Sequence, residues 1–386
     1  MSIQSFLHSQ VLTSVVSRQA SASHSILAFM GMNPGGANEI YLGHGREGSY
    51  HVYDKSRKSA KGRAPGTAAG RSNLQGMKAV AFTYPRMHDS KAMPAEWFNN
   101  LGRIDNPAQR DIAGQEMLRR QTATQALEAA NWRAAMVVGM LKDSLYFHID
   151  GDDYYVDWSS SGAAFQISFN VPASQKSQLN MTDRGGTSVH GGAIVDASWA
   201  TASTDIPLHF AKIDQARAAT GIGPVKHVLI NSTIFELMKN NTKLIAQAGS
   251  SNPPFLTFEQ AMVVNDEGLE VVEKVATFIQ LPGITFHISD EGLELGAPGA
   301  ETFQKYWPAN TATFMGDPQR EDTFSLYLGS EPIAEYDGGP ETVREGLAAW
   351  STKTANPTAT NIFVLDNSLP VNHDPFAVQH ATVVGF

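Results

Sequence analysis

The chain has 386 residues, of which 42% are hydrophobic, and it carries a formal net charge of −9 and no cysteine. This length suits one large or two ordinary globular domains. The acidic balance argues against tight binding of nucleic acid, because phosphates are neutralised by surplus Lys and Arg. The lack of cysteine excludes disulfides and thiolate metal sites. The longest apolar runs fall far short of the ~20 residues of a membrane span.

Residues 1–38 are rich in Ser, Gln and Ala. They show no basic region followed by an apolar run, so no secretory signal is expected. A Pro-Gly-Gly break near residue 34 ends one short amphipathic series. Two interpretations stay open: a frayed terminus, or an arm that becomes ordered only against a neighbouring molecule. The series consists of Ile3, Phe6, Leu7, Val11 and Val15.

Residues 39–92 are markedly basic, with ten basic and three acidic residues from Arg46 to Lys91. Strand-like flanks predict a hairpin with a long basic tip, and loops of this length are usually functional or disordered. In an acidic chain this tip is a candidate contact with an acidic surface of another copy; a plain solvated loop is the alternative. The predicted strands are 39–42 with 50–53, and 78–84. The candidate contact residues are Arg46, Lys55, Arg57, Lys58, Lys61, Arg63 and Arg71.

An irregular lead-in over 84–103, anchored by Trp97 and Phe98, precedes a long helix predicted over 107–142. Asn106 is a good N-cap, because its side chain can accept from a free amide of the first turn. Proline suits the first helical position that follows, where no amide is needed.

Helical spacing continues along the whole of this segment, so at ~1.5 Å per residue the helix would be roughly 54 Å long. A helix of this length needs a large body to lie along. Gly114 and Gly139 each cost about 1 kcal/mol of helix propensity, which favours bending or fraying near the ends. The apolar or small positions with this spacing are Ala123, Ala126, Leu127, Ala130, Ala134, Val137, Val138 and Leu141.

Short strands and helices follow without regular alternation, which favours an α+β fold over a doubly wound sheet. Residues 256–278 suit helix and strand equally. The predicted strands are 146–149, 154–158, 165–169, 225–230, 284–288, 311–315, 324–328, 362–365 and 377–383. The predicted helices are 206–220, stopped by Gly221 and Gly223, then 233–248, capped by Asn231 or Ser232, and 341–350.

Motifs of catalysis and cofactor binding are incomplete. Gly43 to Gly48 matches G-x-G-x-x-G, but a strand-like stretch follows where a dinucleotide site requires a helix. Gly186 to His190 has histidine where a nucleophile elbow requires glycine. Asp150, Asp152 and Asp153 suit a turn better than a metal. No catalytic, cofactor or metal residue is therefore predicted, although catalytic groups need not be adjacent in sequence, and a soluble α+β enzyme stays an alternative.

Seven stretches carry a collinear pattern over almost the whole chain: 84–107, 115–139, 150–158, Trp199 with Asp205 and Ile206, 225–237, 306–311, and 368–370 with 373–379. In this order they resemble the major capsid proteins of tailed bacteriophages of the phage lambda type. The family features they resemble are the approach to the spine helix, that helix, the hairpin after it, the Trp and Asp-rich start of the central domain, its buried strand and helix, the Leu-Pro-Asp-Asn-Thr segment, and the Asp-Pro-Asp-x-Phe-Val-x-Val-Gln ending.

This resemblance implies the tailed-phage/herpesvirus major capsid fold. Its parts would be an N-terminal arm (1–38), an extended loop (39–92), a peripheral domain (93–205) with spine helix 107–142, an axial domain (206–365) and a C-terminal strand (366–386) that returns to the peripheral domain. The resemblance also implies pentamers and hexamers of the chain in an icosahedral virion shell, assembled in the host cytoplasm around double-stranded DNA without sequence-specific binding. Scaffolding, portal and decoration proteins are the partners implied, with no membrane, no cofactor and no catalysis. A compartment shell resembling encapsulins is a further alternative.

Overall fold

The computed structural model describes residues 8–21, 24–41, 47–53, 77–94, 107–151, 153–247, 255–264, 270–319, 323–333, 342–355 and 358–386. Helices and strands are mixed without regular alternation, which confirms the α+β class. The helices are α2 (Ser9–Ser21), α3 (Ser25–Met30), α5 (Pro107–Leu141), α6 (Ile206–Thr220), α7 (Ser232–Lys239) and α8 (Thr242–Gln247), with a 3-10 turn η1 (Ala173–Gln175).

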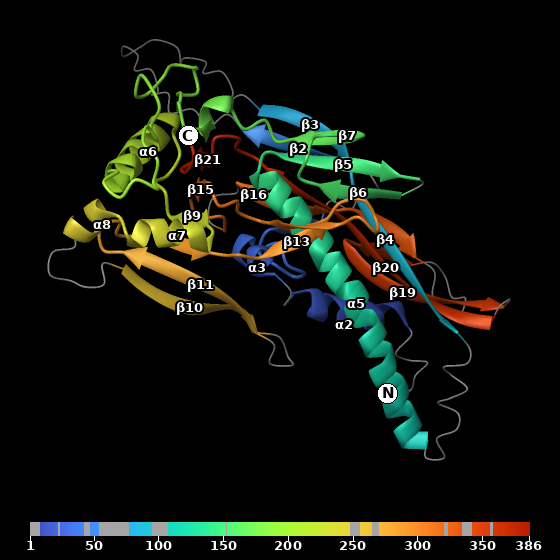
Figure 1. The fold of residues 1–386 in the computed structure, drawn as a ribbon. Helices are drawn as coiled ribbons and strands as arrows, with labels where there is room; N and C mark the ends of the chain where they lie inside the picture. Colours follow the sequence, from blue (N-terminus) through green and yellow to red (C-terminus); the bar gives the residue numbers. More distant parts are fainter. Residues whose placement is uncertain are drawn as a thin grey trace, which may run out of the picture.

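Helix α5 is the long helix expected over 107–142, and its 35 residues form one continuous rod in Figure 1. The expected cap, Asn106, lies outside the described residues. Leu127 is 47% exposed, contrary to its predicted place in the apolar stripe. The buried positions there are Ala126 and Ala130, and residue 127 lies about 100° around the helix from Ala126, beyond the covered face.

A five-stranded sheet lies along α5, and β20 is the strand with which three of the other four pair. β20 pairs with β19 and β4 over residues 358–367 and with β16 over 368–372, while β1 runs parallel to β16. The strands are β1 (Glu39–Tyr41), β4 (Arg86–Pro94), β16 (Phe324–Leu328), β19 (Leu347–Ala355) and β20 (Thr358–Asn372). The pair of β1 with β16 means that residues 39–41 lie in this sheet, not in the basic hairpin where they were expected.

Two predictions are wrong in this region. Residues 86–94, expected to be irregular, form β4, because nine successive pairs with β20 satisfy their backbone groups. The helix expected over 341–350 is replaced by β18 (Thr342–Glu345) and the start of β19. The Ala-rich composition favours helix locally, but pairing with β20 and burial of Leu347 and Ala349 outweigh that preference.

A seven-stranded sheet forms the other end of the molecule, with the order β10-β11-β12-β9-β15-β21-β8. Its strands are β8 (Lys176–Ser177), β9 (His227–Ile230), β10 (Phe255–Val264), β11 (Glu270–Phe278), β12 (Thr285–Ile288), β15 (Thr311–Met315) and β21 (Val378–Thr382). The ambiguous segment 256–278 is thus a pair of strands. Figure 1 shows α6, α7 and α8 beside this sheet, and β4, β19 and β20 on the opposite side of α5.

The predicted helix 233–248 is divided into α7 and α8. Asn231 caps α7 as expected, accepting from the Ile234 amide at 3.0 Å. A second cap that was not expected, Asn241, accepts from the Lys243 and Leu244 amides and starts α8. An Asn side chain that bonds its own following amides competes with a continuous helix. Gly221 ends α6 in the left-handed conformation, as expected of a helix C-terminus.

Four smaller sheets complete the described chain. They are β2 (Glu47–Tyr53) with β3 (Met77–Thr83); β5 (Ser144–Asp150) with β6 (Asp153–Asp157) and β7 (Phe165–Ser168); β13 (Gly292–Leu295) with β14 (Thr302–Lys305); and β17 (Ser330–Ile333) with β18. The hairpin and the third strand predicted after the long helix are confirmed as β5, β6 and β7.

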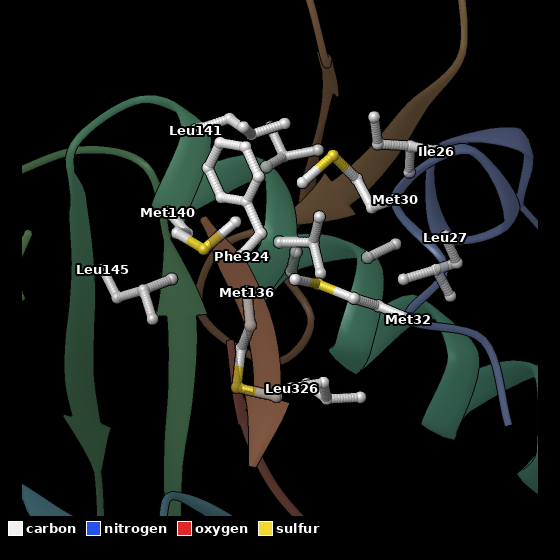
Figure 2. Close-up of a cluster of buried hydrophobic side chains, with 14 of the residues drawn as sticks. Ile26, Leu27, Met30, Met32, Met136, Met140, Leu141, Leu145, Phe324 and Leu326 are labelled. Atoms are coloured by element: carbon white, nitrogen blue, oxygen red, sulfur yellow. The ribbon is translucent and has the colours of Figure 1, made fainter. Parts of the chain in front are cut away.

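Three main apolar clusters hold the described chain together, and one of them joins the two large sheets. One apolar cluster lies between the seven-stranded sheet and helices α6 and α7. A second joins α2 and the middle of α5 to the five-stranded sheet. A third lies around the C-terminal part of α5, where Figure 2 shows flexible methionines filling the space around two side chains of β16. These labelled residues are Met30, Met32, Met136, Met140, Phe324 and Leu326.

Helix α2 belongs to the segment expected to fray or to become ordered against a neighbour. It packs instead on α5 and β19 of its own chain. Leu12 and Val16 are fully buried there, and the Thr13 hydroxyl exchanges hydrogen bonds with the backbone of Ala349. Neither interpretation of the N-terminus therefore describes residues 9–21.

Candidate assembly surfaces

The seven predicted contact residues, Arg46, Lys55, Arg57, Lys58, Lys61, Arg63 and Arg71, lie outside the described residues. The hairpin that carries most of them is described. Strands β2 and β3 pair from Glu47 opposite Thr83 to Tyr53 opposite Met77, which confirms the predicted strand pair. Six of the seven contact residues therefore belong to the segment 54–76 between the two strands.

An aromatic cluster anchors this hairpin to the body. Tyr50 is 2% exposed and lies 5.8 Å from Phe82 and 6.1 Å from His373 in ring-centroid distance. Phe82 in turn meets Tyr84 edge to face at 4.9 Å and stacks on Tyr327 of β16 at 6.3 Å. Burial, with a smaller contribution from Tyr327, raises the pKa of Tyr84 to about 12, so this phenol stays neutral. Such pairs stabilise an interface beyond simple area burial.

His373 adds hydrogen bonds to the same anchor. One ring nitrogen, Nδ1, lies 2.6 Å from the His51 carbonyl, and the other lies 3.1 Å from the Ser325 hydroxyl. The Tyr53 amide donates to the His373 carbonyl at 3.0 Å. Within the described chain β2 and β3 pair as strands only with each other, so aromatic contacts and the hydrogen bonds around His373 hold the hairpin to the body.

A groove of about 570 Å³ lies beside α5, between the start of β4, the β5–β6 hairpin and the β13–β14 hairpin. Its walls carry three large aromatic side chains and three carboxylates, together with Arg86 and His88 of β4. The aromatic residues are Trp132, Tyr154 and Tyr155, and the acidic residues are Glu128, Glu294 and Glu301. Tyr154 fixes one wall, because its hydroxyl bonds to both the carbonyl and the amide of Arg86.

The basic groups near this groove are already engaged. The guanidinium of Arg86 lies 2.9 Å from Glu331, and Lys91 lies 3.2 Å from Glu128. Burial raises the pKa of Glu128, against the opposing effect of Lys91. Glu294 and Glu301 are exposed, and neither forms an ion pair within the described residues. The groove therefore presents acidic and aromatic groups without matching free cations among those residues.

Strand β10 is an outer strand of the seven-stranded sheet and bears exposed apolar side chains. Leu256 and Phe258, two residues apart and so on one face, are 67% and 48% exposed. Phe255 points the other way and packs against Phe235 of α7. An outer strand with exposed apolar residues is a surface prone to association.

No group of three or more His, Asp or Glu side chains in the described part of the chain is placed to hold a metal ion. Among the helices that the structure describes, none combines the length and the apolar character of a membrane span.

Sequence reasoning missed the acidic groove. Glu294 and Glu301 come from a hairpin that was not predicted, and Glu128 comes from the long helix, so they meet only in the folded chain. The alternation of Leu293 and Leu295 with Glu294 was the available signal for β13, since the two leucines are buried and the glutamate is exposed.

No family model matches the sequence. No curated protein matches it either.

Solved structures of similar arrangement exist. A phage-related protein from Bordetella bronchiseptica is 10% identical, with 97% of each chain covered and a TM-score of 0.46. A capsid chain of cyanophage A-1(L) is 12% identical, with 93% of this chain and 92% of that chain covered and a TM-score of 0.42. An encapsulin complex from Synechococcus elongatus is 7% identical, with 90% and 84% covered and a TM-score of 0.40. Values at this level identify no family for the chain.

Proposed function

We propose that this chain is the major capsid protein of a tailed bacteriophage. Copies would assemble as pentamers and hexamers into an icosahedral shell that encloses double-stranded DNA. The observation that carries the proposal is the collinear resemblance over residues 84–379, together with the continuous 35-residue rod of α5 at the position where the family has its spine helix. The aromatic anchor of the β2–β3 hairpin, from which the basic segment departs, supports it.

The architecture suits a building unit of a shell. Helix α5 contributes to two apolar clusters, one of which also joins the two large sheets, so the rod is held against both sheets. Surface ion pairs contribute only about 0–1 kcal/mol each. A closed shell repeats every contact many times, and linked weak contacts hold together far better than single ones. The seven predicted basic contact residues would supply such contacts on a neighbouring copy.

The net charge of −9 suits a wall around packaged DNA. A strongly basic inner face would bind phosphates and oppose both packing and release of the genome. We therefore propose enclosure of DNA without sequence-specific binding. Scaffolding, portal and decoration proteins are proposed partners, and assembly in the host cytoplasm is proposed with them.

The proposed parts are the arm (1–38), the extended loop (39–92), the peripheral domain (93–205), the axial domain (206–365) and the C-terminal strand (366–386). Sheet membership supports two changes to these parts. Strands β16, β19 and β20 lie in the sheet beside α5, so residues 324–328, 347–355 and 358–372 join the peripheral body, whereas β21 lies in the seven-stranded sheet.

Sedimentation and negative-stain microscopy of the purified full chain test the proposal. The expected result is closed particles of uniform size, far larger than the 41.7 kDa chain. A monomer or small oligomer at every protein and salt concentration would contradict it. Nuclease-protected double-stranded DNA in particles from producing cells separates a phage shell from a compartment shell that holds protein cargo.

A further inference from the structure

The side chain of Lys142 lies just after the end of α5 and has no carboxylate partner. Its Nζ atom lies 3.7 Å from the centroid of the Trp158 ring, which is the position of a cation–π contact. Among the residues that the structure describes, no Asp or Glu oxygen comes within ion-pair distance of this nitrogen. Both Lys142 and Trp158 are half-buried, so the contact lies at the surface of the body and not inside its core.

The Trp158 ring is held in place by the residues around it. Its Nε1–H donates to the Ala135 carbonyl at 3.0 Å, and the ring meets Tyr306 edge to face at 6.1 Å. A ring that is fixed in this way keeps water from one face of the lysine nitrogen. Such partial dehydration disfavours the charged ammonium form more than the neutral amine.

The two carboxylates next in sequence to this contact have other partners. Asp143 forms an ion pair with Lys176. The Oδ1 atom of Asp157 accepts from the Trp158 amide at 2.6 Å and from the Gln304 side chain at 3.1 Å. These bonds orient the carboxylates towards other donors, so the amine at the end of α5 has only an aromatic face to stabilise its charge.

The protonation of Lys142 agrees with this geometry. Burial lowers the pKa of Lys142 to about 7, and the charge of Asp157 opposes this shift only in part. The nearby His380 ring adds no charge at neutral pH, because burial together with Lys176 and Lys142 lowers its pKa to about 3. Roughly one ordinary lysine side chain in 2,500 is uncharged at pH 7, and the uncharged amine is the nucleophile.

We propose that Lys142 is an acylation site for small acyl phosphates, because its surroundings leave the amine half-exposed and without a carboxylate partner. The Nζ lone pair attacks the carbonyl carbon of the acyl phosphate, and a C–N bond forms. The bond from that carbon to the phosphate oxygen breaks, inorganic phosphate leaves with the electron pair, and the amine proton passes to solvent. The product is a neutral amide, which needs no counter-ion beside the Trp158 ring.

Acetyl phosphate and the purified full chain test the proposal. After the reaction, deuterated acetic anhydride blocks the remaining lysines in denaturant, and mass spectrometry of the peptides gives the acetylated fraction at each lysine. The matched control is Lys176, which lies in the same region but is held by Asp143. At pH 7, Lys142 should react about tenfold faster than Lys176. An equal or slower reaction at Lys142 would overturn the proposal.

The pH dependence of the rate distinguishes an uncharged amine from an amine that is merely accessible. The rate at Lys142 should level off above about pH 7.5, since most of this amine is then deprotonated. An ordinary lysine gains about tenfold in rate per pH unit up to pH 9, and the exposed Lys243 of α8 is the reference for that behaviour. Rates at Lys142 and Lys243 that rise in parallel would contradict the proposal.

Discussion

Arg133 and Asp366, 233 residues apart in the chain, form a fully buried two-pronged ion pair between α5 and β20. The guanidinium bonds lie at 2.6 and 3.0 Å, and a third bond of 2.7 Å reaches Glu39 of β1. Burial alone would lower the pKa of Arg133, but the two carboxylates raise it above its usual value. One side chain of the long helix thereby joins two strands of the five-stranded sheet.

We predict that Asp366→Asn destabilises the unassembled chain by about 3–5 kcal/mol, because it leaves a buried guanidinium without its main partner. Urea unfolding followed by circular dichroism measures the loss. The control, Lys91→Met, breaks the more exposed pair with Glu128 and should cost less than about 1 kcal/mol. Similar losses of stability in the two variants would show that the buried ion pair contributes no more to stability than the exposed one.

Gly139 of α5 allows β5 to approach the helix closely. A β-carbon added there would lie 2.4 Å from Leu145 Cδ2 and 3.2 Å from the Ser144 carbonyl oxygen. Gly139→Ala should therefore destabilise the chain by about 1 kcal/mol, since the overpacking cost of about 1–3 kcal/mol exceeds the gain in helix propensity.

The double variant Gly139→Ala with Leu145→Ala isolates this contact. In a thermodynamic cycle the two substitutions should be less damaging together than the sum of their single effects. A stabilised single variant would mean that helix propensity, not packing, governs this position.

His227 and His287 should make the free energy of unfolding depend on pH. Their ring nitrogens lie 2.9 Å apart, and Phe29 of α3 packs on both rings. Burial, together with His287 and Lys226, lowers the pKa of His227 to about 4, against the opposing charge of Asp317. The unfolded ring titrates near 6.5, so the stabilisation is complete above that pH and is lost as the pH falls from about 6.5 to 4.

The variant His227→Gln should lose about 2 kcal/mol less stability than the wild type over this pH range. Each unit of pKa shift corresponds to about 1.4 kcal/mol, and the value is reduced because solvent reaches part of the ring. Urea midpoints of the unassembled chain between pH 4.5 and 7.5 measure it. The exposed His8→Gln serves as the control. If wild type and His227→Gln lose stability in parallel, the histidine pair is not the cause.

Charge reversal of Lys55, Arg57, Lys58 and Lys61 should reduce particle formation at least tenfold and leave the unassembled chain folded. The reason is that the basic segment is proposed to contact an acidic surface of a neighbouring copy. Sedimentation measures the yield, and circular dichroism checks the fold. The matched control reverses four lysines outside the basic segment: Lys239, Lys243, Lys274 and Lys305. A normal particle yield from the fourfold variant of the basic segment would show that this segment is not needed for assembly.

Local signals in the sequence determined the elements that depend on nearby residues. The period of the long helix, the glycine that ends α6, the cap at Asn231 and the turn between β5 and β6 all act within a few positions, and each is found where it was expected. The basic composition of 54–76 is likewise a property of the sequence alone.

Only the tertiary structure decided which distant segments meet. Residues 86–94 and 347–355 form strands because both segments pair with β20. The partner of β4 lies more than 250 residues further along the chain, and no local sequence pattern predicts a pairing over that separation. The same holds for Arg133 with Asp366 and for the three glutamates of the groove. Helical periodicity and capping depend on residues that are close in sequence. Strand pairing, buried ion pairs and grooves depend on contacts between residues far apart in sequence, and these contacts are fixed only when the whole chain packs together.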